Sequence, residues 1–103
     1  MTAGTIPVVR CSTSVATPLA ARYMAQLCKH FQHRCPVTLG EASGRITFTM
    51  GDCALVATDG VLTLALGAPN DAAMTQLQDV VGRHLLRFAF REALALQWQP
   101  GGA

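Results

Sequence analysis

The chain has 103 residues, of which 50% are hydrophobic and 14% charged, and its formal net charge is +2. This length is typical of one domain and suffices for a hydrophobic core without disulfide or metal cross-links. The small charge argues against nucleic-acid binding, which favours a strongly basic face, and no apolar run approaches the roughly 18–20 residues of a membrane span. We therefore predict a single domain over residues 1–103, with an ordered core over 5–99, a flexible tail over 100–103, and neither nucleic acid nor membrane as a partner.

The apolar composition and the N-terminus predict the assembly and the compartment. Surplus apolar surface is expected to be buried in the core or between subunits, which favours a homodimer. The start of the chain, MTAGTIPVVRCS, lacks the basic segment and longer apolar segment of a signal peptide. We therefore expect a cytoplasmic protein in which all four cysteines are reduced thiols: Cys11, Cys28, Cys35 and Cys53.

The first elements in the chain are a strand and a helix. Residues 5–14 are rich in β-branched types, which predicts a strand. Residues 17–34 predict a helix, because Thr17 is suited to the N-cap and Pro18 to the first turn. Pro36 is expected to end this helix, since the residue before a proline is disfavoured in the helical conformation.

A series of strands follows. Residues 44–51 alternate between apolar and polar side chains, which is typical of a half-buried strand. Asp59 and Gly60 form a dipeptide that favours a tight hairpin turn. Four strands are therefore predicted within residues 35–43, 44–51, 52–60 and 61–69.

Residues 70–93 predict the second helix, with Asn70 or Asp71 as its cap. Leu86 and Phe90 lie off its main apolar stripe, where exposed apolar side chains suit a dimer contact. The stripe itself has helical spacing and consists of Met74, Leu77, Val81, Leu85 and Phe88.

This order of elements predicts the fold class. Residues 94–99 are expected to form a last short strand or an extended tail. Consecutive strands between two helices indicate an α+β fold of two layers, in which a curved antiparallel sheet carries both helices on one face. The topology is similar to TATA-binding-protein-like and helix-grip folds, but a fold does not fix a function.

The stretch CKHFQHRC, from Cys28 to Cys35, raises the question of a metal site. On a helix, Cys28 and His30 lie about 160° apart, so they cannot converge on one ion. His33 lies about 60° from His30, but a fourth ligand would have to come from His84. We therefore expect no metal and favour positive charge at the end of a helix, where the helix dipole stabilises Lys29, His30, His33 and Arg34.

His84 lies among Val80, Val81 and Phe88 on the apolar stripe of the second helix. A histidine that faces a core needs a hydrogen-bond partner, so the favoured interpretation is a paired core histidine that ties the helix to the sheet. The alternative is that His84 lines a pocket between helices and sheet, which His30 would share.

Arg83, Arg87 and Arg91 are spaced one helical turn apart. One interpretation is a solvated face, on which Asp79 pairs with Arg83 at i,i+4. The other is an anion site, in which these guanidinium groups act with Lys29. The sequence contains no GxSxG motif and no glycine-rich phosphate loop, and it shows no pair of acids suited to acid/base catalysis, so we predict no catalytic residue and no cofactor.

Three sequence segments resemble those of a known family: RYMAQLCKHFQHRCPV, GRITFTMGDCALVA and LQDVVGRHLLRFAFREALALQWQ. Over Thr17 to Gln99 the chain is similar to the domain of unknown function 2218 family, small bacterial proteins that also occur joined to, or encoded beside, siderophore-interacting flavin-dependent ferric reductases. The resemblance implies a setting in siderophore-iron handling and no established activity; Cys35 departs from the family pattern. The residues that match are Arg22, Tyr23, Cys28, Lys29, His30, Phe31, His33, His84, Arg87, Phe88, Phe90 and Arg91.

Three functional hypotheses follow. The first is a binding or accessory module for an anionic ligand such as a ferric siderophore, with a flavin-dependent ferric reductase as the partner that performs the redox step. The second is an interaction module that forms a homo-oligomer without a small ligand, and the third is an enzyme with His84 or His30 as general base. The predicted ligand-binding residues are Tyr23, Lys29, His30, His33, His84 and Arg87.

Overall fold

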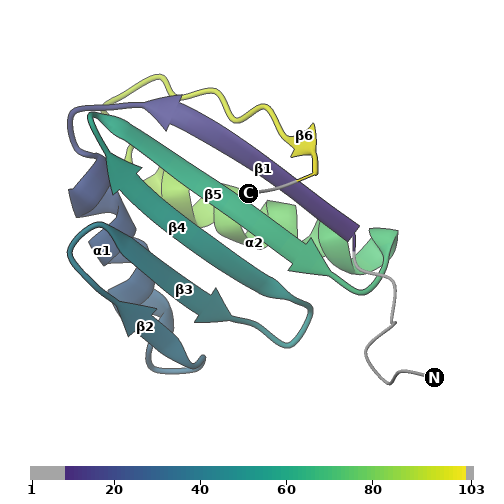
Figure 1. Ribbon diagram of the computed structural model, residues 1–103. Coiled ribbons are helices and arrows are strands. Elements are labelled where there is room, and N and C mark those ends of the chain that lie inside the picture. Colours follow the sequence, from purple (N-terminus) through teal and green to yellow (C-terminus); the bar gives the residue numbers. More distant parts are fainter. Residues whose placement is uncertain (1–8, 102–103) are drawn as a thin grey trace.

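The computed structural model describes residues 9–101, which form a six-stranded sheet with two helices against one of its faces (Figure 1). This confirms the predicted α+β architecture. Residues 5–8, predicted as the start of the first strand, lie outside the described part. The elements are β1 (Val9–Ala16), α1 (Ala20–Phe31), β2 (Val37–Leu39), β3 (Ser43–Thr47), β4 (Asp52–Thr58), β5 (Val61–Ala68), α2 (Asp71–Phe88) and β6 (Gln99–Pro100).

The strands are all antiparallel to their neighbours and follow the order β2-β3-β4-β5-β1-β6. The strands β2 to β5 form a meander, and β1 pairs with β5 along its whole length. The predicted hairpin between β4 and β5 is confirmed. Its turn residues Asp59 and Gly60 have φ angles of 50° and 72°, which match the right-handed twist of the flanking strands.

The core lies between the sheet and the helices. Alternate residues of each central strand point to the helices, and on β5 these are Leu62, Leu64 and Leu66. The helix α1 packs on β2 to β5, whereas α2 packs on β5 and β1. On α2 the predicted apolar stripe is buried except that Phe88 is half-buried; its buried members are Met74, Leu77, Val81 and Leu85.

Cys28 is a buried packing residue of α1 that lies against β3 of the sheet. Its side chain is fully buried, and burial raises the pKa of its thiol. A Cβ atom added to Gly44 on β3 would lie 2.9 Å from Cys28 Sγ. Because Gly44 has no side chain, there is room for the Cys28 thiol against β3. Cys28 packs there as a small apolar group rather than as a reactive thiol.

Both helices end earlier than the sequence predicts. The helix α1 ends at Phe31 instead of residue 34, because the backbone N–H groups of Arg34 and Cys35 both turn back to the Phe31 carbonyl. The helix α2 ends at Phe88 instead of residue 93, and a turn from Ala89 follows. His33 and Arg91 therefore lie outside the helices, so neither the predicted row of arginines nor the predicted His30–His33 pair continues along a helix.

The N-terminal ends of the two helices agree better with the sequence prediction than their C-terminal ends do. The Asn70 side chain accepts a hydrogen bond from the Ala73 backbone N–H at 2.8 Å and so caps α2. The Thr17 hydroxyl accepts from the Leu19 N–H at 3.1 Å, as an N-cap does, although the α-helix itself begins at Ala20.

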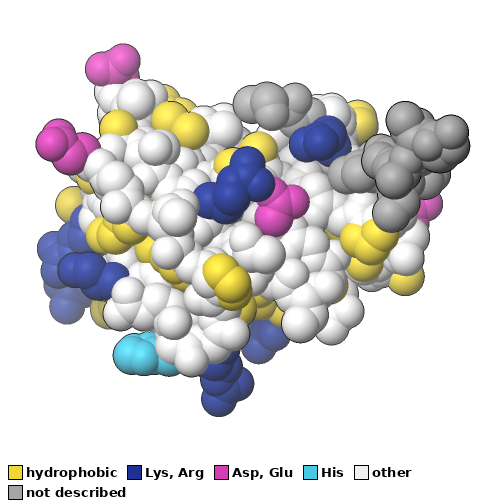
Figure 2. Space-filling model, turned by 60° about the horizontal axis from the view of Figure 1, so that its bottom comes forward, with side chains coloured by type: hydrophobic (Ala, Val, Ile, Leu, Met, Phe, Trp, Pro, Cys, Tyr) yellow, Lys and Arg dark blue, Asp and Glu magenta, His cyan; other side chains and the backbone are white. Residues whose placement is uncertain are grey.

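The second face of the sheet carries no helix. Figure 1 shows both helices behind the strands, and Figure 2 shows that much of the surface over the strands is polar, uncharged or backbone. An exposed ion pair joins Arg45 on β3 to Asp52 on β4. Large apolar side chains are few on this face; Val56 is 41% exposed.

The segment after α2 returns across the molecule to the sheet. Leu94, Leu96 and Trp98 are half-buried against the core, and the short strand β6 then pairs with β1. The sequence places a loose tail from residue 100 onward, but Pro100 lies opposite Cys11 in this pairing. Neither helix of the described residues combines the length and the apolar character needed to cross a membrane.

Candidate functional site

A cleft of about 650 Å³ lies between the start of α1 and the segment that follows α2. Tyr23 and Gln26 reach it from α1, and they share one side of that helix with His30 because the spacing is i, i+3, i+7. Phe88 lines the cleft from the last turn of α2. The remaining lining residues are Pro18, Leu19, Arg22, Phe90, Arg91 and Glu92.

A carboxylate fixes one side of the cleft. Glu92 accepts a hydrogen bond from the Tyr23 hydroxyl, and the Thr17 hydroxyl lies 2.9 and 3.0 Å from its two carboxylate oxygens. Tyr23 and Thr17 are both buried. The hydrogen bond to Glu92, assisted by burial, raises the pKa of Tyr23. These bonds tie the Glu92 side chain to α1 and to the loop before it, at one side of the cleft.

A histidine pair lies beside the cleft, where α1 and α2 meet. The rings of His30 and His84 are 4.8 Å apart between centroids and tilted by 42°. Phe88 lines the cleft and also contacts His30 edge-on, with centroids 5.7 Å apart, so it joins the two regions. Phe31 packs against both histidines at 4.8 and 4.9 Å.

The two histidines have different surroundings. His84 is half-buried and its Nδ1 lies 2.7 Å from the Val80 carbonyl of its own helix, so Nδ1 carries a hydrogen and donates it to that carbonyl. This differs from the favoured interpretation, in which His84 ties the helix to the sheet. His30 is exposed, and its pKa is lowered, first by desolvation and then by the positive charges of His84, Arg87, Arg34 and His33.

The predicted site residues fall into three groups. Tyr23 lines the cleft, and His30 and His84 form the adjoining pair. Arg87 is exposed near enough to His30 for its charge to act on that ring. Lys29 and His33 are exposed and are not among the residues that line the cleft. The structure therefore does not bring all six predicted residues together.

The helical side of the protein is basic. Of the eight Lys and Arg residues, six lie in the two helices or within three residues after their ends. Figure 2 shows basic side chains at the side of the molecule where Figure 1 places α1. Among the nearby acids, Asp79 pairs with Arg83 at 3.5 Å, as predicted. The six are Arg22, Lys29, Arg34, Arg83, Arg87 and Arg91.

Sequence reasoning missed most of the cleft, because Tyr23 is the one predicted ligand-binding residue among its nine lining residues. Two of the polar lining residues, Gln26 and Glu92, had been given no role in any site. Gln26 was open to prediction, because it lies three residues after Tyr23 and four before His30 on the same side of α1. Glu92 had no such signal. It belongs to a segment that the pattern assigns to helix, and tertiary hydrogen bonds determine its position.

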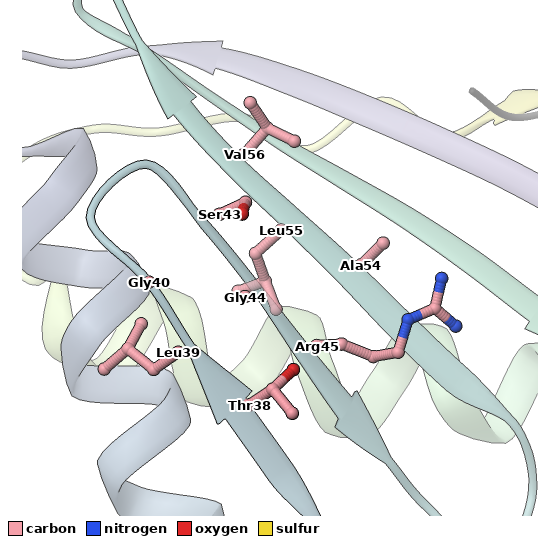
Figure 3. A pocket seen from close by; sticks show the side chains of 9 residues that line it. All are labelled: Thr38, Leu39, Gly40, Ser43, Gly44, Arg45, Ala54, Leu55 and Val56. Carbon is pink, nitrogen blue, oxygen red and sulfur yellow. The ribbon is translucent and has the colours of Figure 1, made fainter.

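The described residues contain no group of three or more His, Cys, Asp or Glu side chains arranged to hold a metal ion. A second hollow, of about 480 Å³, lies over β3 and β4 on the uncovered sheet face (Figure 3). Figure 3 shows the Arg45 side chain extending from β3 over β4, beside the small side chain of Ala54. Arg45 is its only charged lining residue and is already paired with Asp52, so this hollow is the weaker candidate.

A family model described as an uncharacterised protein conserved in bacteria, domain of unknown function 2218, matches residues 12–99. The chain belongs to the domain of unknown function 2218 family. The family match spans every described helix and strand except the first residues of β1 and the last residue of β6.

A solved structure supports the family fold. The chain is similar to PA4090 from Pseudomonas aeruginosa, determined by NMR, with 36% identity and a TM-score of 0.77. The likeness covers 92% of this chain and 99% of PA4090. No curated protein matches the chain significantly.

Proposed function

We propose that this protein is a non-enzymatic binding module that holds an anionic small molecule, a ferric siderophore, in the cleft between α1 and α2. The observation that carries this proposal is that Arg22 and Arg91 border a cleft whose apolar walls include Phe88 and Phe90. Pockets of this size and mixed character suit small organic ligands. The siderophore setting is what the family resemblance implies, and the charge and aromatic content of the cleft agree with it.

The chemistry of the cleft favours one class of ferric siderophore. Guanidinium groups attract anions and also stack on aromatic rings, and the Arg91 guanidinium carbon lies 5.4 Å from the centroid of the Phe90 ring. A ferric catecholate complex carries negative charge and aromatic rings, whereas a ferric hydroxamate complex lacks both features. We therefore expect this protein to prefer the catecholate.

A separate enzyme would perform the redox step. We propose that the protein presents the ferric complex to a flavin-dependent ferric reductase in the cytoplasm, because the chain has no flavin or nucleotide motif of its own. The exposed basic groups Lys29 and His33, beside the histidine pair, are free to contact an acidic surface of such a partner.

Isothermal titration calorimetry tests the proposal. Purified protein is titrated with a ferric catecholate siderophore, with the same siderophore free of iron, and with a ferric hydroxamate siderophore. Saturable binding of the ferric catecholate, weaker binding of its iron-free form and little heat from the hydroxamate would support the proposal. Folded protein that gives no heat with any ferric siderophore would overturn it.

Matched variants locate the binding. Arg91→Gln removes a charge from the cleft, and Arg83→Gln removes the same charge from the outer side of α2, where Arg83 pairs with Asp79. We expect Arg91→Gln to weaken binding about tenfold, the effect of losing one charge-assisted hydrogen bond, and Arg83→Gln to leave it nearly unchanged. Equal effects of both variants would indicate nonspecific attraction by the basic surface.

A homodimer is the second candidate, and a specific observation favours it. Leu19, Leu86 and Phe90 are 38%, 41% and 74% exposed near the same end of the two helices. Exposed apolar groups of this kind are typical of interfaces. Sedimentation equilibrium distinguishes the cases: a dimer that Phe90→Ser dissociates supports an interface there, whereas a strict monomer excludes it.

A further inference from the structure

Two sulfur atoms lie in contact where β1 packs on α2. The Cys11 thiol on β1 donates a hydrogen bond to the Met74 thioether on α2, with Sγ and Sδ 3.3 Å apart. Both side chains belong to the core, each with an exposed fraction of 5%. Thiolate and thioether sulfur are soft donors, the kind that Cu(I) prefers. The fold therefore brings together two soft metal ligands from residues that lie 63 positions apart in the chain.

The sulfur pair borders a groove of about 370 Å³ between α2 and the sheet edge that β1 and β6 form. Cys11, Met74 and Trp98 line the groove, and Arg10 and Asp71 contribute charges of opposite sign. The groove shares no lining residue with the cleft described above. It therefore gives a small ion an approach to the sulfur pair that does not pass through the cleft.

Gln78 supports negative charge on the thiol sulfur. Its side-chain Nε2 donates to Cys11 Sγ at 3.2 Å, from a position one turn further along α2 than Met74. A hydrogen bond to the charged form of a group favours that form, and the partners behind a metal ligand also hold it in position. When the Cys11 thiol loses its proton, Sγ keeps this donor, and the lone pair of Met74 Sδ becomes free to bind a metal.

The separation of the sulfurs is close to what a shared metal ion requires. Two sulfurs bound to one ion at about 2.3 Å each, with an angle of about 120° at the metal, lie about 4 Å apart. The pair would have to widen by about 0.7 Å, which the flexible side chain of Met74 permits. Within residues 9–101 no group of three or more His, Cys, Asp or Glu side chains includes Cys11. The pair therefore suits Cu(I), which few ligands can hold, better than Zn(II), which takes a tetrahedral set.

We propose that Cys11 and Met74 form a Cu(I) site at the wall of this groove. The Cu–S bond to Cys11 replaces its S–H bond, the proton passes to solvent, and Met74 donates a lone pair, so no electron is transferred. Thiolate and Cu(I) then form a neutral unit, which can be held in a buried position without an unpaired charge. This inference goes beyond the proposed function, because the site, its ligand and its test involve neither the cleft nor a siderophore.

Competition with a coloured Cu(I) chelator tests the proposal. Reduced protein is titrated without oxygen into the Cu(I) complex of bicinchoninate, whose absorbance falls as the protein takes the ion. In parallel, protein labelled with ¹³C in its methionine methyl groups is titrated with Cu(I) and observed by NMR. We expect saturable removal of Cu(I) from the chelator and a shift of the Met74 methyl signal. The signal of Met24, buried on α1, should stay in place, and Zn(II) should shift neither.

Matched variants identify the ligands. Met74→Leu removes the thioether but keeps an apolar side chain of similar size. We expect it to weaken Cu(I) binding at least about tenfold, since the loss of a ligand should cost no less than the loss of a partner behind one. Met24→Leu makes the same change at a buried position of α1 and should leave the affinity unchanged. Cys11→Ser should abolish binding, whereas Cys35→Ser, in the segment between α1 and β2, should preserve it.

Each outcome decides for or against the site. Protein that takes no Cu(I) from bicinchoninate would overturn the proposal. Uptake without a shift of the Met74 methyl signal would place the ion on other thiols and overturn it as well. Equal Cu(I) affinities of folded Met74→Leu and Met24→Leu would show that the thioether is not a ligand. Circular dichroism verifies the fold of each variant, and if Cys11→Ser does not fold, the two methionine variants decide.

Discussion

Tyr23 donates its hydroxyl hydrogen to the carboxylate of Glu92, which lies 69 residues further along the chain. Thr17, in the loop before α1, donates to the same carboxylate. Together these bonds tie the β1–α1 loop, α1 and the segment after α2 into one unit. Because Phe90 and Arg91 immediately precede Glu92, this unit also determines where two of the side chains that line the cleft lie.

The Tyr23–Glu92 hydrogen bond predicts a loss of stability at alkaline pH. The pKa of Tyr23 is raised above its ordinary value of 10.0, chiefly by this bond. The folded protein therefore holds the phenolic proton more tightly than the unfolded chain, so the stabilisation is complete below pH 10.0 and is lost as the pH rises through the folded-state pKa. Urea midpoints measured on both sides of pH 10.0 should fall with rising pH, and Tyr23→Phe should reduce that slope. An equal slope in the variant would contradict the assignment.

The histidine pair predicts a second pH effect, at acid pH. The pKa of His30 is lowered from 6.5, first by desolvation and then by the positive charges of His84, Arg87, Arg34 and His33. The unfolded chain therefore binds this proton more readily, so stability is complete above pH 6.5 and decreases as the pH falls through the range below it. An NMR titration of the His30 ring should give a midpoint below 6.5. A midpoint at or above that value would show that the neighbouring charges do not act on His30.

We predict that any side chain at Gly51, in the turn between β3 and β4, lowers the stability of the fold. Its φ angle is 156°, and a Cβ atom there would collide with the Gly67 carbonyl oxygen. We expect Gly51→Ala to lower the free energy of unfolding by about 2–3 kcal/mol, since both the backbone and the contact are strained. Gly40→Ala is the control, because its nearest contact would be Ser43 O at an ordinary 3.6 Å. Similar urea midpoints for the two variants would contradict this account.

Two adjacent leucines of α2 provide a test of the core. Leu85 is fully buried, whereas Leu86 is 41% exposed. Leu85→Ala should lower the free energy of unfolding by about 2–5 kcal/mol through lost burial and the cavity it leaves. Leu86→Ala should cost less than about 1 kcal/mol, because little apolar area is lost. Chemical unfolding of both variants measures the difference, and a large cost at Leu86 would instead indicate a subunit interface.

Part of the candidate site was open to sequence reasoning, but its geometry was not. The helical spacing of Tyr23, Gln26 and His30 places them on one side of α1 from sequence alone. The meeting of His30 with His84 depends on how α1 and α2 pack over the sheet, and their ring separation of 4.8 Å belongs to that packing. Local pattern carries no information about such contacts between distant segments.

The sequence by itself determined the order of elements, the hairpin at Asp59 and Gly60, and the apolar faces, because backbone preference and side-chain periodicity act over a few residues. Only the tertiary structure decided that α2 stops at Phe88 and that Arg91 and Arg22 line the same cleft. The physical reason is that residues 89–92 have a helical pattern, whereas the hydrogen bonds of Glu92 to Thr17 and Tyr23 stabilise a different conformation. Those partners are neighbours in space but not in the chain, so their effect arises only when the two helices are packed on the sheet.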